Sequence, residues 1–260
     1  GAYVMVLPVL AFFILFSYKP MLGALIAFKN FSPRLGIFKS SWAGSYGFEH
    51  FMNFFKSFYF WCLLRNTVTI SFAGLIFVFP IPIIFALMIN EVKNARFKKS
   101  VQTISYMPHF ISLVVVCSMI RLFVSEDGFI VYIMQKLGYS GSQNLLNVQN
   151  AFVPIYILSD IWQNAGWNSI IYLAALSAID LELYEAARID GANRWRQTVH
   201  VTLPGISGTI ILLLILRIGQ VMSVGHEKII LLYNDFIMER ADVISSYVYR
   251  RGLEIGRAHV

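Results

Sequence analysis

The chain has 260 residues, of which 57% are hydrophobic, 15% aromatic and only 13% charged. Soluble domains carry about 25% charged residues, so the composition excludes an ordinary soluble domain and predicts an all-α, polytopic membrane protein. The net charge of +7 comes from 21 Lys and Arg residues that are scattered between apolar runs. This distribution is typical of positive loops beside membrane spans rather than of a nucleic-acid-binding face.

Five stretches have the length and apolarity of a membrane-spanning helix, which needs about 20 apolar residues. They cover residues 1–18, 67–89, 101–120, 151–179 and 204–225. Pro80 and Pro82 predict a kink or break in the second stretch, because proline removes a helical hydrogen bond. The last three stretches each hold one residue that stands out for its charge: His109, Asp160 and Arg217, respectively.

The short loops predict the orientation of these spans. Residues 91–99 carry four positive charges in nine residues, which favours the cytoplasmic side. The loop 180–203 then lies on the same side. Residues 226–253 are expected outside, as a loop and an interfacial helix. Residues 19–60 are also assigned to the outside, although they hold five Lys and Arg residues, because their charge density is lower.

The two cysteines, Cys62 and Cys117, are far apart and lie in or beside apolar segments. Each is expected to be a buried, unpaired thiol rather than part of a disulfide or a metal site. The first span is expected to be clipped, and a sixth span, which would follow residues 226–253, is expected to be truncated.

The loop between the fourth and fifth spans has a helix–turn–helix pattern. Residues 181–190 are good helix formers, Gly191 can adopt a positive φ that ends a helix, and Pro204 is expected to start the next element. Small side chains at 186, 187 and 192 would let another protein approach closely. The residues alone leave two alternatives open, a docking segment or an ordinary surface helix.

Residues 185–204 resemble the EAA loop of binding-protein-dependent ABC importers. The pattern of that loop is Glu-Ala-Ala, three residues, Gly, nine residues, Ile, one residue and Leu-Pro; here Val201 replaces the Ile. In that family the loop is a coupling helix that sits in a groove of the ATPase subunit. The resemblance therefore assigns ATPase coupling to Glu185, Ala186, Ala187, Asp190, Gly191, Ala192, Leu203 and Pro204.

Four further segments, at 105–112, 158–167, 171–176 and 229–234, resemble carbohydrate-uptake permeases of the LplB group. The similarity covers residues 2–253 and implies a MetI-like transmembrane permease domain over 1–253. Residues 254–260 resemble a translated sequencing adapter and are expected to be a non-native tail. The similarity also implies a bacterial plasma membrane location, a second homologous permease, two ATPase subunits and an extracytoplasmic sugar-binding lipoprotein. No cofactor is expected on this chain, and ATP and Mg would be used by the ATPase subunits.

Motifs of catalysis are missing from the sequence. There is no Gly-x-x-x-x-Gly-Lys-Ser/Thr run, which argues against the chain being the ATPase, and no His-Glu-x-x-His, paired-Cys or Gly-x-Ser-x-Gly arrangement. A non-catalytic subunit is therefore expected, and the resemblance implies a permease for an oligosaccharide. The alternatives are a permease of the same architecture for amino acids or peptides, an ion-coupled secondary transporter and, least favoured, a membrane-embedded enzyme.

Polar groups inside a membrane are expensive and usually face a cavity or a partner. Amides beside tryptophans suit sugar binding, although the same residues could pack between helices or at a permease–permease interface. The fourth span holds the densest polar set, namely Asp160, Trp162, Gln163, Asn164, Trp167 and Asn168.

Arg217 and Gln220 of the fifth span could share a face with Asp160, and an Asp160–Arg217 ion pair is the favoured arrangement. His109 is expected to be a satisfied core residue rather than a proton relay. Gly166 would permit a close helix contact or a local break.

Overall fold

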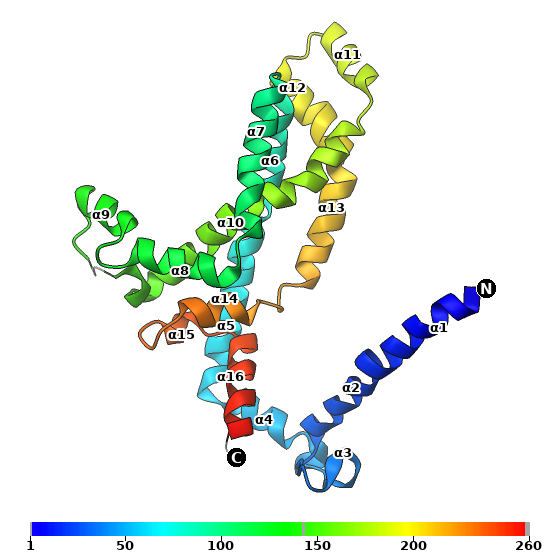
Figure 1. The fold of residues 1–260 in the computed structure, drawn as a ribbon, viewed down its shortest axis with the longest axis vertical. Helices are drawn as coiled ribbons and strands as arrows, with labels where there is room; N and C mark the ends of the chain where they lie inside the picture. Colours follow the sequence, from blue (N-terminus) through cyan, green and yellow to red (C-terminus); the bar gives the residue numbers. More distant parts are fainter. Residues whose placement is uncertain (1, 142–143, 258–260) are drawn as a thin grey trace. The chain divides into compact units, whose positions relative to one another are not determined.

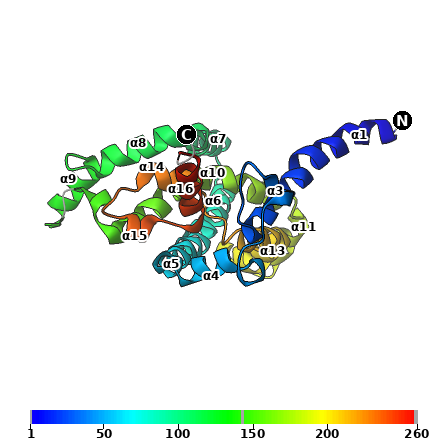
Figure 2. The ribbon, with the colours of Figure 1, turned by 90° about the horizontal axis from the view of Figure 1, so that it is seen from below.

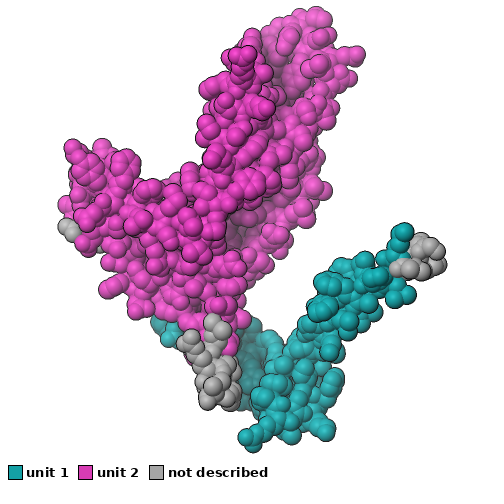
Figure 3. All heavy atoms as spheres, in the orientation of Figure 1, with its two compact units in different colours: residues 1–61 teal, residues 62–260 magenta. Residues whose placement is uncertain are grey.

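The computed structural model describes residues 2–141 and 144–257 and divides into two compact units, Gly1–Trp61 and Cys62–Val260 (Figure 3). Within these residues all regular structure is helical, apart from one isolated antiparallel bridge between Lys29 and Trp42. The predicted all-α class is confirmed. Residues 258–260 of the predicted non-native tail lie outside the described residues.

The first unit opens with a long apolar helical segment. It consists of α1 (Ala2–Phe13), a π-helical turn η1 (Ile14–Tyr18), α2 (Lys19–Met21) and a 3₁₀ segment η2 (Leu22–Phe28). Residues Met5–Phe28 are long and apolar enough to span a membrane, so the first span extends ten residues beyond the predicted end at residue 18. Shorter helices follow: α3 (Gly36–Lys39), η3 (Ser45–Gly47) and α4 (Glu49–Lys56).

The second span is one long helix made of α5 (Phe58–Ala73), η4 (Gly74–Val78) and α6 (Pro80–Glu91) (Figure 1). The boundary between the two units falls within α5. The sequence predicted a kink or a break at Pro80 and Pro82, and the helix is not broken there. Instead, a π turn lies directly before Pro80, where the amide of Phe79 donates to the carbonyl of Gly74 at 3.1 Å.

The same arrangement recurs before two other prolines. The π turns η1, η4 and η8 (Thr198–Thr202) each end two residues before a proline, at positions 20, 80 and 204. Proline has no amide hydrogen and its ring clashes with the carbonyl four residues earlier. A locally widened turn relieves this conflict without breaking the helix. Pro204 lies in the first turn of α13 (Leu203–Gly219), as the sequence predicted, but α13 continues a helix that already begins at Arg194.

The third predicted span, 101–120, is not one straight helix. The segment α7 (Ala95–Tyr106) with η5 (Met107–Phe110) is bent by 98° from α8 (Leu113–Val124) with α9 (Phe129–Lys136). Ile111 has extended backbone, and the side chain of Ser112 caps the new helix by accepting from the amide of Val115 at 3.5 Å. Residue 108 is a proline, which makes continuation of the first helix unfavourable.

The central helix of the second unit is α10 (Phe152–Ser177), which follows the short turns η6 (Leu145–Asn147) and η7 (Gln149–Ala151). It packs against α6, α7 and α13 (Leu203–Gly219). Three helices among the described residues are long and apolar enough to span a membrane, or four if the bent pair counts as one. The helix α10 is not among them, because its polar residues lower its mean hydropathy.

The C-terminal segment contains α14 (His226–Leu232), α15 (Met238–Ala241) and α16 (Ile244–Arg257). Ile229 and Leu232 of α14 are fully buried in a cluster with Ile70, Cys117 and Phe152. In Figure 2, α14 lies beside α8. Part of the segment that the sequence assigned to a loop and an interfacial helix is thus a component of the core.

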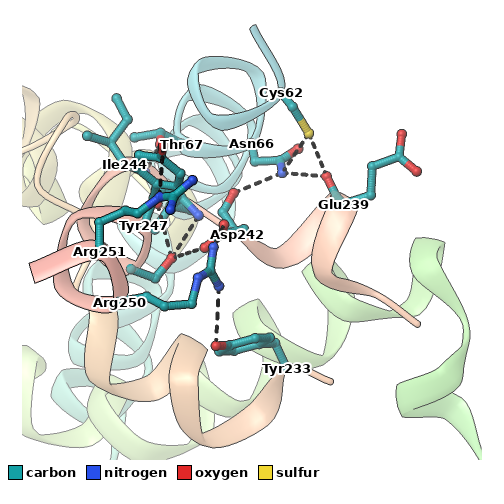
Figure 4. A network of polar contacts seen from close by, with 12 residues as sticks. Cys62, Asn66, Thr67, Tyr233, Glu239, Asp242, Ile244, Tyr247, Arg250 and Arg251 are labelled. Carbon is teal, nitrogen blue, oxygen red and sulfur yellow. Dashed lines mark hydrogen bonds and ion pairs between the residues drawn. The ribbon is translucent and has the colours of Figure 1, made fainter. Parts of the chain in front are cut away.

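A polar network attaches this segment to α5 (Figure 4). The amide of Asn66 donates to the carbonyls of Glu239 at 2.8 Å and Asp242 at 2.9 Å. The buried carboxylate of Asp242 accepts from Ser246 at 2.6 Å and pairs with Arg250 at 2.5 Å. Because each buried polar group has a partner, the network fixes α16 against α5.

Cys117 is buried in the core, as expected. Cys62 is only partly buried, and its thiol donates to the carbonyl of Glu239 at 2.9 Å.

Gly166 forms a close helix contact, which is one of the two expected alternatives. A Cβ at this position would overlap the backbone carbonyl oxygen of Ser105 on α7. We expect Gly166→Ala to lower the free energy of unfolding by about 1–3 kcal/mol, because the obstructing atom belongs to the backbone and cannot rotate away. Reversible unfolding in mixed detergent micelles measures this.

Gly208→Ala on α13 is the matched control, since no atom lies within 4 Å of a Cβ there. Alanine should leave stability unchanged or raise it by up to about 1 kcal/mol. Equal losses in the two variants would contradict the proposed contact between α7 and α10.

Candidate functional site

The loop between α10 and α13 begins with α11 (Leu181–Ile189). Asp180 caps the first turn of this helix, because its side chain accepts from the amide of Glu182 at 3.0 Å. Gly191 has φ +77°, as its position predicted. The amide of Gly191 donates to the carbonyl of Arg188 at 3.0 Å, and the amide of Ala192 donates to the carbonyl of Ala187 at 2.8 Å. These two bonds form a Schellman motif, which ends α11 sharply.

The chain then starts a second helix at once. Asn193 caps α12 (Arg194–Gln197) by accepting from the amide of Arg196 at 2.9 Å. The hydroxyls of Tyr184 and Thr202 lie 3.0 Å apart and connect α11 to η8. The segment is therefore a helix–turn–helix held by its own hydrogen bonds, and it continues through η8 into α13.

Large apolar side chains are exposed on this segment: Leu181, Leu183, Ile189 and Trp195, of which Ile189 is 87% and Trp195 74% exposed. Of the residues assigned to coupling, Glu185, Ala186, Asp190, Gly191 and Pro204 are exposed and Ala187, Ala192 and Leu203 are half-buried. Clustered exposed apolar groups between charged residues mark a surface that contacts another molecule. We call the segment 181–203 the docking loop.

The docking loop lies at the same end of the second unit as the basic loop between α6 and α7 (Figure 1). Arg194 of the docking loop lies 3.6 Å from Glu91 at the end of α6. Both side chains are largely exposed, so the pair adds little stability. Its geometry nevertheless agrees with the prediction that the two loops share one side of the membrane.

A cavity of about 330 Å³ opens between α6, α10 and α13. Asp160, Asn164 and Asn168 line it from α10, where their spacing of four residues puts them on one helix face. Arg217 and Gln220 line it from the end of α13. A smaller cavity of about 170 Å³ adjoins it at Asp160, Arg217 and Gln220 and extends toward Ser71 and Gly225. We call the two together the polar cavity.

Asp160 has its own partners inside the protein. Its carboxylate accepts from Asn164 at 2.7 Å and lies 4.0 Å from the amine of Lys228 on α14. Lys228 is buried, donates to the carbonyl of Tyr156 at 3.1 Å, and lies over the Tyr156 ring. Burial lowers the pKa of the Lys228 amine, and the negative charge of Asp160 opposes that change.

The expected ion pair between Asp160 and Arg217 does not form. Among the described side chains, no carboxylate lies within 4.0 Å of the Arg217 guanidinium. Lys228 takes its place because α14 folds back against α8 and α10. The sequence analysis missed Lys228, because this residue lies in a segment assigned to an outer loop. The available signal was its position directly before the apolar run 229–232.

The two tryptophans and Gln163 of α10 lie outside the polar cavity. Trp167 stacks on His109 with ring centroids 4.7 Å apart, and the ring of His109 bonds Asn164 at 2.9 Å. Gln163 is buried and donates to the carbonyl of Ile111 at 3.4 Å, while Trp162 is half-exposed on another face. His109 is thus a satisfied side chain at the bend between η5 and α8, as expected.

Residues 78–224 match the family described as "Binding-protein-dependent transport system inner membrane component". This stretch contains the docking loop and most of the polar cavity. The chain belongs to this family. Its expected membrane nature and its place among the permeases of ABC transporters are confirmed with it.

Two curated members of the family from Bacillus subtilis (strain 168) resemble the chain along almost its whole length. The polygalacturonan/rhamnogalacturonan transport system permease protein YteP is 44% identical over 98% of this chain and 78% of its own length. Protein LplB is 43% identical over 98% of this chain and 79% of its own. The predicted resemblance to the LplB group is confirmed.

A solved permease chain has the same fold. The structure of a bacterial ABC transporter involved in the import of the acidic polysaccharide alginate contains a chain that is 44% identical, with a TM-score of 0.89 over 98% of this chain and 85% of that one. A second structure of the bacterial alginate ABC transporter, in complex with an alginate pentasaccharide-bound periplasmic protein, gives a TM-score of 0.88 at 44% identity over 98% of this chain and 84% of that one. The predicted MetI-like permease fold is confirmed.

The Asp160–Lys228 contact can be tested by a double-mutant cycle. Lys228→Met should lower the free energy of unfolding by about 2 kcal/mol, because it leaves the Asp160 carboxylate without a cation; the partial exposure of Asp160 keeps this below the value for a fully buried pair. Asp160→Asn in the same chain should recover about 1 kcal/mol or more of that loss. Unfolding in mixed detergent micelles measures all four variants, and strictly additive losses would show that the two charges do not interact.

Proposed function

We propose that this chain is a transmembrane permease subunit that forms half of the pathway of a saccharide importer and that is driven by separate ATPase subunits. The observation that carries the proposal is the docking loop, a self-supported helix–turn–helix with exposed Ile189 and Trp195, which follows the family's EAA pattern. Family membership and the two curated relatives support the importer class.

The docking loop is mechanically continuous with the polar cavity. Its second half enters a helix that runs without interruption from Arg194 to Gly219. At a rise of about 1.5 Å per residue this helix is about 39 Å long, and Arg217 of the cavity lies near its far end. A displacement of the loop by a motor subunit would therefore move the cavity wall, which is the linkage that alternating access requires.

The substrate is a saccharide on the strength of the relatives, whose names specify polygalacturonan, rhamnogalacturonan and alginate. The carboxamides of Asn168 and Gln220 suit this class, because each offers both donors and acceptors to hydroxyl groups. The chain itself performs no catalysis in this scheme, and ATP with Mg is consumed by the motor subunits.

The partners follow from the same scheme. A second homologous permease completes the pathway, two ATPase subunits bind the docking loops from the cytoplasm, and an extracytoplasmic sugar-binding lipoprotein delivers the substrate. The complex lies in the bacterial plasma membrane. A related periplasmic protein that carries an alginate pentasaccharide in complex with its transporter supports the delivery step.

Two changes in the docking loop should abolish coupling. Ile189→Asp places a charge on an exposed apolar contact and should weaken binding of the ATPase subunit by about tenfold or more. Gly191→Pro is incompatible with φ +77°, because proline locks φ near −65°, so it should remove sugar-stimulated ATP hydrolysis. Co-purification and ATPase assays on the reconstituted complex measure both effects.

Leu137→Asp is the matched control, since Leu137 is 83% exposed at the end of α9 and belongs to neither the docking loop nor the polar cavity. It should leave ATPase binding unchanged. Wild-type coupling in both loop variants would refute the assignment of the loop.

The substrate class is tested with wild-type complex in lipid vesicles, supplied with the cognate binding protein and a panel of oligosaccharides, amino acids and peptides. We expect ATP hydrolysis to rise with saccharides alone. Stimulation by amino acids or peptides alone would overturn the saccharide assignment, and sugar uptake that persists without ATP would overturn the ATP-driven mechanism.

A further inference from the structure

Arg217 is a charged side chain near the end of an apolar helix that is able to span a membrane. Ionisable residues in such helices are costly, so they normally pair with an opposite charge or face a functional cavity. Asp160, which lines the same cavity, is the acid that would pair with it. The geometry of the polar cavity shows that this acid is already in use.

The Asp160 carboxylate is balanced by Lys228 at 4.0 Å and hydrogen-bonded by Asn164 at 2.7 Å. Lys228 is held in place by a second bond, to the carbonyl of Tyr156 at 3.1 Å. These two charges therefore cancel within the wall of the polar cavity. The positive charge of Arg217 is left in excess on the cavity side.

Arg217 lines the polar cavity from the end of α13. Among the described side chains no carboxylate lies within 4.0 Å of its guanidinium, and the side chain is exposed. A Cβ atom added to Gly74 would lie only 3.2 Å from a terminal nitrogen of the Arg217 guanidinium. Gly74, in the π turn before Pro80, thus leaves room for the guanidinium at the cavity wall.

We propose that Arg217 binds the carboxylate groups of an acidic, uronate-containing oligosaccharide as it passes through the polar cavity, and so selects for charge. This proposal rests on the proposed function and names the substrate class within it. A guanidinium presents a planar fork of donors that matches a carboxylate in two parallel bonds. Asn168 and Gln220 line the same cavity and are suited to the neutral hydroxyls of the sugar.

The test uses the complete complex in lipid vesicles: both permeases, the ATPase subunits and the cognate binding protein. The probes are oligogalacturonate and oligoalginate, each compared with the same oligosaccharide after its carboxyl groups are reduced to alcohols. Arg217→Gln removes the charge at similar size, Arg217→Lys retains it, and Arg121→Gln removes an exposed charge of α8 that lies outside the polar cavity. Loading of the binding protein is measured separately for each sugar.

At equal loading, Arg217→Gln should lower kcat/KM for uptake of the acidic sugars by about tenfold or more, which is the usual loss for a hydrogen-bonded charge pair. Uptake of the reduced sugars and basal ATP hydrolysis should change by less than about twofold. Arg217→Lys should restore most of the uptake of acidic sugar, and Arg121→Gln should behave as wild type.

Equal losses for acidic and reduced sugars, or failure of the Gln variant to assemble with the second permease, would assign Arg217 a structural role and overturn the proposal. If the binding protein does not load a reduced sugar, uptake of the acidic sugar is compared between Arg217→Lys and Arg217→Gln. Equal uptake by these two variants would exclude a role for the charge and overturn the proposal. If the wild-type complex responds to no saccharide at all, the proposed function fails rather than this inference.

Discussion

The structure depends on one constraint: a polar group in an apolar environment must find a partner or face a cavity. The prolines of the long helices satisfy it through π turns, which keep the helix from breaking where an amide hydrogen is missing. Asn66 and Asp242 satisfy it by joining α5 to the C-terminal segment. Asp160 satisfies it through Lys228. Arg217 has no such partner among the described side chains, and it satisfies the same constraint by facing the polar cavity.

The sequence predicted the features that depend on local conformation. The helix of 181–190 and the positive φ of Gly191 were both predicted, because each follows from the backbone preferences of a glycine or from a run of helix-forming residues. At Gly166 the sequence left a close contact and a local break as alternatives, and the structure shows the contact. The polar face of Asp160, Asn164 and Asn168 was also predictable in part, since a spacing of four residues puts side chains on one face of a helix. The family pattern added the role of the docking loop, which local physics alone left open.

The errors arose where distant segments meet. The 98° bend after η5 brings α8 against α14. Pro108 was the local signal, but a proline alone does not distinguish a bent span from a straight one, because Pro80 lies in a helix that continues. The error over the partner of Asp160, which is Lys228 and not Arg217, has the same origin. The polar residues of α14 suggested an outer loop, yet this helix buries Lys228, Ile229 and Leu232. The predicted break at Pro80 and Pro82 did not occur for a different reason, since a π turn accommodates a proline that an ideal α-helix would not tolerate.

The central claim is that residues 181–203 form the surface on which a motor subunit docks. The most direct measurement is labelling of a single cysteine at position 189, in a chain whose Cys62 and Cys117 are replaced by serine and alanine, within membrane vesicles of known orientation. The account predicts labelling from the cytoplasmic face alone, and protection when the ATPase subunit is added. Labelling from the outer face, or equal labelling with and without the ATPase subunit, would contradict it.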